Sequence, residues 1–280
     1  MPGDPTFPHR TSMQDTVAAP SPSLPSRALR VLASSGYGLW LLLGAALALG
    51  VYPAGRGDAL VPLALGGVLV SFAPLAAVLR LPRVPDWLGW RFGRGSRPTA
   101  KAMLALAAYL PMLGVAGLVR GDNLFWATRL AAAALALGAL ACLIDALSED
   151  AQEGRARIFA RLVSASYAGG LWLWLCLAAQ DGDQPIHSVP WIFALQLLAL
   201  LVGGVFWWRD GAVRSRGWPG RLLFLALVYL IPCLIVLAQR PESSGLLLLL
   251  AAVSCLVGKS VEPRLCGRLS SHDGGVFRAT

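Results

Sequence analysis

Charged residues are scarce in this chain of 280 residues: they make up 14% of it, against 56% hydrophobic residues. Soluble domains carry roughly 25% charged residues, so the composition excludes a soluble fold and predicts an integral membrane protein. The net charge of +9 does not indicate nucleic-acid binding, because the basic residues stand in links between apolar runs and not on a folded basic face. We therefore expect membrane lipid, and no nucleic acid, as a partner.

Residues that bind cofactors are equally scarce. The only histidines are His9, His187 and His272, all outside the apolar runs, so a b-type haem held by paired axial histidines is excluded. The five cysteines form no C-x-x-C pair, which excludes the usual iron–sulfur and zinc spacings, and we expect those inside apolar runs to be buried as small hydrophobes. No phosphate-binding loop and no H-E-x-x-H motif occurs. These absences predict no catalytic residue, no metal site and no covalently bound cofactor.

Long apolar runs dominate what is present, and each could cross, or nearly cross, a hydrocarbon core of ~30 Å. The runs are Val31–Gly55, Ala59–Leu79, Ala102–Val119, Leu124–Leu147, Leu162–Gln180, Ser188–Trp208, Leu222–Gln239 and Ser243–Val261. They predict an all-α integral membrane protein with eight transmembrane helices, with a kink at Pro111 in the third; Pro232 lies inside the seventh. The transmembrane domain would cover residues 31–261, between a disordered N-terminal tail (1–30) and a C-terminal tail (262–280).

Basic residues set the predicted orientation. If the N-terminal tail and every second loop share one side, that side carries twenty of the 24 Lys and Arg residues. Six of them stand in the link Arg80–Lys101. The other side carries only four, and its loop after the fifth run is acidic. By the positive-inside rule both termini are predicted to be cytoplasmic.

Some polar residues within the apolar runs allow two interpretations, and the aromatic residues near the ends of the runs allow one. Asp145 could accept a proton from a quinol or pair with a base such as Lys259, or it could be an ordinary carboxylate near a helix end. Lys259 could pair with Glu262, three residues on, or extend its amine to the interface, as we expect of Arg129. Tyr37 and Trp40 are predicted to be interfacial anchors of the first helix, and other tryptophans, Trp87 among them, would form aromatic belts.

Three stretches resemble the membrane anchor subunit of dimethyl sulfoxide reductase-type molybdoenzymes, within the wider polysulfide-reductase anchor family. Ser34–Leu39 is similar to the family's S-G-x-G-Y-G-L opening of the first span. The block Ser71–Pro111 is similar to its S-x-x-H-L-G-R-P…W-R…S-W-L-S-R-E…P segment, with Trp87 and Arg94 in register. Val257–Gly267 is similar to its G-x-x-V-E-R-W-L-F-F close. The family's His and Gly are missing from Leu79–Arg83, and its Glu is replaced by Lys101.

This resemblance implies a non-catalytic subunit of an oxidoreductase complex in a bacterial plasma membrane, crossing it several times. Such a subunit holds an iron–sulfur electron-transfer subunit and a molybdopterin catalytic subunit at the membrane, and exchanges electrons with menaquinol or ubiquinol. The family's polar positions near the quinone fall on a few residues here: Tyr37, Arg83, Trp87 and Asp145. The basic link would dock the acidic face of the partner, and its candidate residues are Arg91, Arg94, Arg97 and Lys101.

Two other functions stay open on the sequence. A membrane scaffold or assembly protein without a redox role would fit the missing His and Glu. A small-solute transporter would fit the prolines inside predicted helices and the partial depth of Asp145. Transporters often contain internal repeats, and the two halves of this chain show no evident one.

Overall fold

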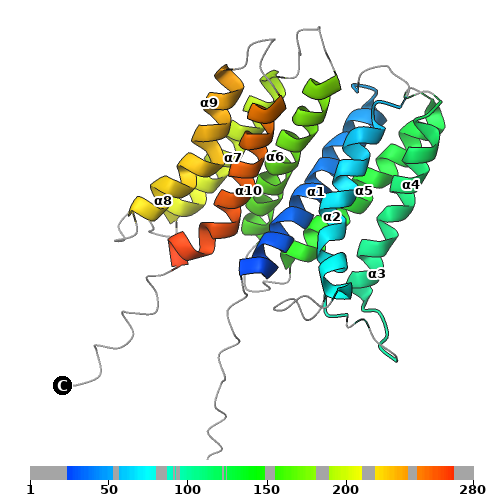
Figure 1. Cartoon of the computed structure of the whole chain (residues 1–280), viewed down its shortest axis with the longest axis horizontal. Coiled ribbons are helices and arrows are strands. Elements are labelled where there is room, and N and C mark those ends of the chain that lie inside the picture. The colour runs from blue at the N-terminus through cyan, green and yellow to red at the C-terminus, as the bar shows by residue number, and fades with distance from the viewer. Residues whose placement is uncertain are drawn as a thin grey trace, which may run out of the picture.

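The computed structural model describes residues 24–52, 57–79, 87–90, 92, 95–121, 123, 125–148, 155–180, 189–209, 218–238 and 245–267. This part of the chain is a bundle of helices (Figure 1). The helices are α1 (Leu24–Leu49), α2 (Leu60–Val78), α3 (Ala100–Ala107), α4 (Tyr109–Leu118), α5 (Trp126–Ser148), α6 (Arg155–Gln180), α7 (Val189–Arg209), α8 (Trp218–Leu225), the π-helical segment η2 (Ala226–Leu230), α9 (Ile231–Ala238) and α10 (Gly245–Gly267).

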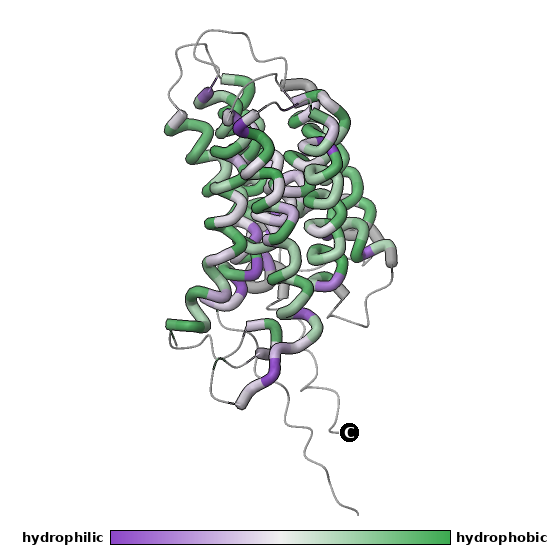
Figure 2. The backbone as a smooth tube through the Cα atoms, turned by 90° about the vertical axis from the view of Figure 1, so that its right-hand side faces the viewer, coloured by the Kyte–Doolittle hydropathy of each residue, from purple (hydrophilic) through white to green (hydrophobic). Residues whose placement is uncertain are grey.

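Seven helices in the described residues are long and apolar enough to cross a membrane; α3 with α4 counts as one of them, and so does the unit formed by α8, η2 and α9. An eighth apolar helix, Trp191–Val205 within α7, is shorter. Large side chains face outward, among them Leu110 at 70% and Leu137 at 67% exposure. Hydrophobic residues run along the bundle, and hydrophilic ones lie mainly towards its ends (Figure 2). The fold is therefore that of a multi-pass membrane protein.

Helix α1 lies at the centre and packs on α2, α5 and α6. It begins at Leu24, so it includes residues 24–30, which the composition had assigned to the tail. Pro25 falls in the first turn, where a proline costs no intrahelical hydrogen bond. The start of α1 and the end of α10 lie at the same end of the bundle (Figure 1). We call this the terminal end, and the other the opposite end.

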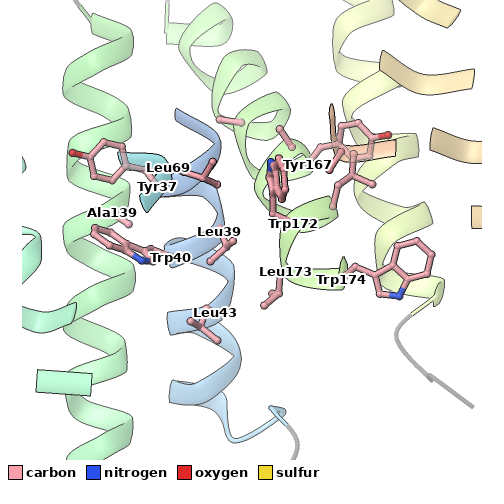
Figure 3. Packing of buried hydrophobic residues seen from close by; sticks show 14 of the residues in the cluster. Tyr37, Leu39, Trp40, Leu43, Leu69, Ala139, Tyr167, Trp172, Leu173 and Trp174 are labelled. Carbon is pink, nitrogen blue, oxygen red and sulfur yellow. The ribbon is translucent and has the colours of Figure 1, made fainter. Parts of the chain in front are cut away.

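The prediction that Tyr37 and Trp40 anchor the first helix at the interface is wrong. Tyr37 is 7% exposed and Trp40 is fully buried, and both lie in the main hydrophobic core (Figure 3). The early start of α1 explains the difference, because it moves both residues from the end of a helix to its middle.

The predicted kink at Pro111 is confirmed, and the span that contains Pro232 is distorted as well. The third span is broken at Ala108 into α3 and α4, three residues before Pro111. The seventh is distorted into the π-helical segment η2 just before Pro232. A proline has no N–H for the preceding turn and its ring crowds the carbonyl four residues back, so each helix changes its hydrogen bonding there.

Candidate functional site

The first candidate site is built around Tyr37, on the most tightly packed turn of α1. Glycines flank it on both sides. A Cβ at Gly36 would lie 2.9 Å from Leu69 Cβ in α2, and one at Gly38 would lie 2.3 Å from the Ala165 carbonyl oxygen in α6. The glycines let two helices approach α1 closely, which fixes Tyr37 between them. This is the physical content of the Ser34–Leu39 motif.

Aromatic rings connect Tyr37 to the broken third span. Its ring meets Trp40 edge to face at 6.0 Å, and Trp40 meets Tyr109 in the same way at 5.5 Å. The indole N–H of Trp40 donates to the Leu63 carbonyl in α2 at 3.0 Å. Gly66 leaves room for this indole, because a Cβ there would lie 2.4 Å from its nitrogen. Edge-to-face ring pairs of this kind stabilise a packing by about 1 kcal/mol beyond burial.

A pair of hydroxyl groups lies beside these rings. Ser71 Oγ and the Tyr109 hydroxyl are 2.9 Å apart, and Ser71 Oγ also lies 2.6 Å from the Gly67 carbonyl oxygen. That carbonyl can only accept, so Ser71 donates to it and Tyr109 donates to Ser71. The break at Ala108 places Tyr109 at the first position of α4. Two half-buried hydroxyls from different helices are thus held together within the bundle.

Cys142 of α5 completes this group. Its sulfur lies 3.7 Å from the Leu104 carbonyl oxygen and is hydrogen-bonded to the Tyr37 hydroxyl. The thiol hydrogen is directed at the carbonyl, so Tyr37 donates to the sulfur. Asp145 follows one turn later on α5, is half-buried, and acts electrostatically on Cys142. We call Tyr37, Trp40, Ser71, Tyr109 and Cys142 the Tyr37 cluster.

The Tyr37 cluster consists of neutral hydroxyl groups between apolar walls. The hydrogens of Ser71 and Tyr109 are given to the Gly67 carbonyl and to Ser71, so their oxygens can accept from a ring hydroxyl, and the aromatic rings can stack on the ligand ring. A hydroquinone headgroup carries ring hydroxyls and fits these acceptors. In the described part of the chain no group of His, Cys, Asp and Glu could hold a metal ion.

Trp87, the third candidate quinone residue, lies in a separate group. It packs with Ala77, Ala102 and Ala105, and with the rings of Trp90 and Phe92; we call these residues the Trp87 cluster. Residues 87–90 form a tight turn with positive φ at Leu88 (49°) and Gly89 (74°). Thr99 caps α3 and donates to the Leu88 carbonyl at 2.8 Å, which fixes this turn at the terminal ends of α2 and α3.

The structure thus places Tyr37 and Asp145 on either side of Cys142. Trp87 lies in the separate cluster at the terminal end of the bundle. Arg83 lies outside the described residues, as do the docking candidates Arg91 and Arg94. The other two docking candidates flank the start of α3: Arg97 is exposed and Lys101 half-buried.

Two basic residues that were expected at the interface donate to carbonyl groups of neighbouring helices. Lys259 of α10 donates to the Ser164 carbonyl of α6, and Glu262 and Arg161 lie within electrostatic range of this end of α10. Arg129 of α5 donates through Nε to the Ala48 carbonyl at 3.0 Å. Ala48 belongs to the last turn of α1, whose carbonyls have no partner within the helix, so Arg129 acts as a C-cap from a neighbouring helix.

Tyr109, Ser71 and Cys142 were not predicted as site residues. Ser71 and Pro111 bound the block of family resemblance, and the Tyr-Leu-Pro sequence at 109–111 marks a break in a buried helix. Those were the signals available. The chain matches no family model, no curated protein and no solved structure.

Proposed function

We propose that this chain is the membrane anchor and quinone-coupling subunit of a dimethyl sulfoxide reductase-type molybdoenzyme in a bacterial plasma membrane. In this role it crosses the membrane eight times and passes electrons between quinol and an iron–sulfur partner subunit, in anaerobic respiratory electron transport. A molybdopterin subunit acts on the terminal substrate. The chain performs no chemistry on that substrate.

The observation that carries the proposal is the meeting of two separate resembling stretches. Tyr37 comes from the Ser34–Leu39 stretch, and Ser71 and Tyr109 come from the Ser71–Pro111 block. In the fold these residues are joined by ring contacts through Trp40 and by the hydroxyl pair of Ser71 and Tyr109. If the two stretches resembled the anchor family only by chance, we would not expect their residues to meet in one cluster of hydroxyl groups and aromatic rings.

Within this proposal the residues have distinct tasks. Bound quinol supplies two electrons and releases two protons when it is oxidised. Tyr109 and Ser71 hold its ring oxygens, Trp40 and Tyr37 line its ring, and Asp145 takes up a proton towards the terminal end of the bundle. The Trp87 cluster shields the adjoining end from water. Arg97 and Lys101 lie at the same end and meet an acidic partner face.

Purification in mild detergent tests the proposal. The tagged chain should co-purify with an iron–sulfur protein and a molybdopterin protein, and the complex should oxidise quinol. A chain that purifies alone without cofactors would contradict it, and a complex with partners but without quinol oxidation would indicate a scaffold. Uptake of a solute by vesicles that hold only this chain would indicate the transporter alternative.

A further inference from the structure

The second half of the bundle repeats the arrangement of the first. Helix α6 packs on α7 and α10 as α1 packs on α2 and α5, and α8, η2 and α9 pack on α10 as α4 packs on α5. The two groups lie on either side of the central pair α1 and α6 (Figure 1). Within the described residues each half has four helical units, when α3 and α4 count as one and α8, η2 and α9 count as one. Because four is an even number, both halves enter the bundle from the same end.

Sequence matches follow the same pairing of helices. Tyr37 in α1 corresponds to Tyr167 in α6, each with a serine three residues earlier. Tyr-Leu-Pro at 109–111 corresponds to Tyr-Leu-Ile-Pro at 229–232, and a basic residue stands eight positions before each tyrosine. Cys-Leu at 142–143 corresponds to Cys-Leu at 255–256, with a glutamate seven positions after each cysteine.

A single inserted residue separates the two halves at the kinked span. The second half has Ile231 between Leu230 and Pro232, where the first half has nothing. Immediately before this position the helix widens into η2. A π turn is the way a helix absorbs one extra residue. The insertion also hides the repeat from a direct comparison of the two halves.

The matched residues Tyr167, Tyr229 and Cys255 form a second polar group together with Gln196 and Ser254, and we call these five residues the Tyr167 cluster. Tyr167 and Tyr229 stack at 5.6 Å, and Cys255 lies near both tyrosines, as Cys142 lies near Tyr37 and Tyr109. Tyrosine, tyrosine and cysteine therefore recur on equivalent helices in both halves.

Three side chains of the Tyr167 cluster bind consecutive carbonyls of η2. Ser254 donates to Leu227 at 2.7 Å, Tyr167 to Val228 at 3.1 Å and Gln196 to Tyr229 at 2.9 Å. Pro232 has no N–H, and in α or π geometry that N–H would be given to Val228 or Leu227 respectively. The hydroxyls of Tyr167 and Ser254 take its place.

Gln196 keeps an unused acceptor. Its amide nitrogen is committed to the Tyr229 carbonyl, which fixes the orientation of the amide. Its side-chain oxygen is buried without a hydrogen-bond partner among the described residues, in a side chain that is 5% exposed. A buried acceptor without a donor costs roughly 1–3 kcal/mol, so a group that donates to it binds favourably. On the adjoining α6 the buried indole N–H of Trp174 also has no partner in the described chain.

We propose that the chain is an internal duplication of a four-helix unit, and that the second unit holds its own ligand position at the Gln196 side-chain oxygen, for a ring hydroxyl of the hydroquinone class. The ligand class rests on the proposed function, whereas the duplication does not. In the first unit the hydrogens of Tyr109 and Ser71 are given to protein acceptors, so their oxygens are left to accept, and the second unit offers the Gln196 oxygen as an acceptor that requires a donor. A hydroquinone, which carries ring hydroxyls, supplies that donor.

Transporters built from parallel repeats bind their substrate between the two halves. Here the helices between the halves meet at Gly38 and Gly169, where a Cβ on Gly169 would lie 2.3 Å from the Gly38 carbonyl carbon. The two halves are in backbone contact at this level. The proposed positions therefore lie within each unit and not between them.

Titration of the purified full-length chain with a short-chain ubiquinol, followed by quenching of tryptophan fluorescence, tests this inference. We expect two ubiquinols per chain. Gln196→Met should remove one, and Tyr109→Phe should weaken the other about tenfold. Ser254→Ala is the matched control, because it removes a similar bond to η2 without touching the acceptor, and it should leave both sites.

Each other outcome decides something different. One ubiquinol per chain, weakened only by Tyr109→Phe, overturns the second site and leaves the proposed function standing. No binding at all overturns both. If Gln196→Met and Ser254→Ala change ubiquinol binding equally, Gln196 only supports η2, and the second site is overturned. If the Gln196→Met variant does not fold, the wild-type chain can be labelled with a photoreactive azidoquinone. Label within residues 189–209 supports the second site. Label confined to residues before 149 overturns the second site.

Discussion

Gly38 of α1 and Gly169 of α6 cross in direct backbone contact at the centre of the bundle. A Cβ on Gly169 would lie 2.2 Å from the Leu39 backbone nitrogen, and one on Gly38 would lie 2.3 Å from the Ala165 carbonyl oxygen. Both of these neighbouring atoms belong to the backbone, so neither can move aside without shifting a helix. The two halves of the chain are joined at this crossing.

Replacing Gly169 by alanine should therefore destabilise the bundle. Overpacking of this kind costs about 1–3 kcal/mol, partly offset by the higher helix propensity of alanine, ~1 kcal/mol. Unfolding in detergent by added SDS measures the change. Gly117→Ala in α4 is the control, because it is exposed and nothing lies within 4 Å of its Cβ position; it should be neutral or stabilising. Equal stability of the two variants would contradict the close crossing.

The support of η2 predicts a non-additive pair of substitutions. Tyr167→Phe removes the donor to the buried Val228 carbonyl and should cost roughly 1–3 kcal/mol of unfolding free energy. Pro232→Ala restores an N–H that can reach the same carbonyl. In the Pro232→Ala background Tyr167→Phe should then cost clearly less, which a double-mutant cycle measures. Strict additivity would show that Tyr167 does not replace the missing N–H.

Asp145 is predicted to take up a proton beside the Tyr37 cluster. Asp145→Asn should slow quinol-dependent reduction of the partner subunits by at least about tenfold and leave assembly of the complex unchanged. Asp58→Asn is the control: Asp58 lies at the opposite end, and its backbone carbonyl, not its side chain, accepts from Gln180. Unchanged turnover in Asp145→Asn would return Asp145 to the role of an ordinary carboxylate near a helix end.

Arg97 and Lys101 are predicted to contribute to docking through charge. Replacing both by glutamine should weaken association with the iron–sulfur subunit at low salt and have less effect at high salt, because exposed charges are screened. Arg120→Gln, an exposed residue at the opposite end, should leave association unchanged. If the double variant binds its partner as tightly as the wild type at every salt concentration, these residues serve only to set the topology.

Much of the fold could be predicted from the sequence, because membrane helices are long and apolar. The apolar runs, the kink at Pro111, and the burial of Cys142 and Cys255 all correspond to the structure. The start of α1 could not be read from hydropathy, since residues 24–30 are polar enough to resemble a tail. Tyr37 was misplaced for that reason.

The candidate site was predictable only in part. Tyr37 and Asp145 carried signals of their own, but Ser71, Tyr109 and Cys142 have meaning only when four helices are brought together. The duplication was missed because Ile231 shifts the register of the kinked span and because the links between helices differ in length. The two halves share few identical residues, among them the pairs Tyr37 and Tyr167, Tyr109 and Tyr229, and Cys142 and Cys255.

Quinol oxidation by the Tyr109→Phe variant tests the central claim most directly. The substitution keeps the ring contact with Trp40 and removes only the hydroxyl that lies beside Ser71. One lost hydrogen bond should raise the KM for quinol about tenfold, while Tyr52→Phe, at the opposite end of the bundle, should leave it unchanged. An unaltered KM in Tyr109→Phe, with the complex fully assembled, would contradict a quinol site in the Tyr37 cluster.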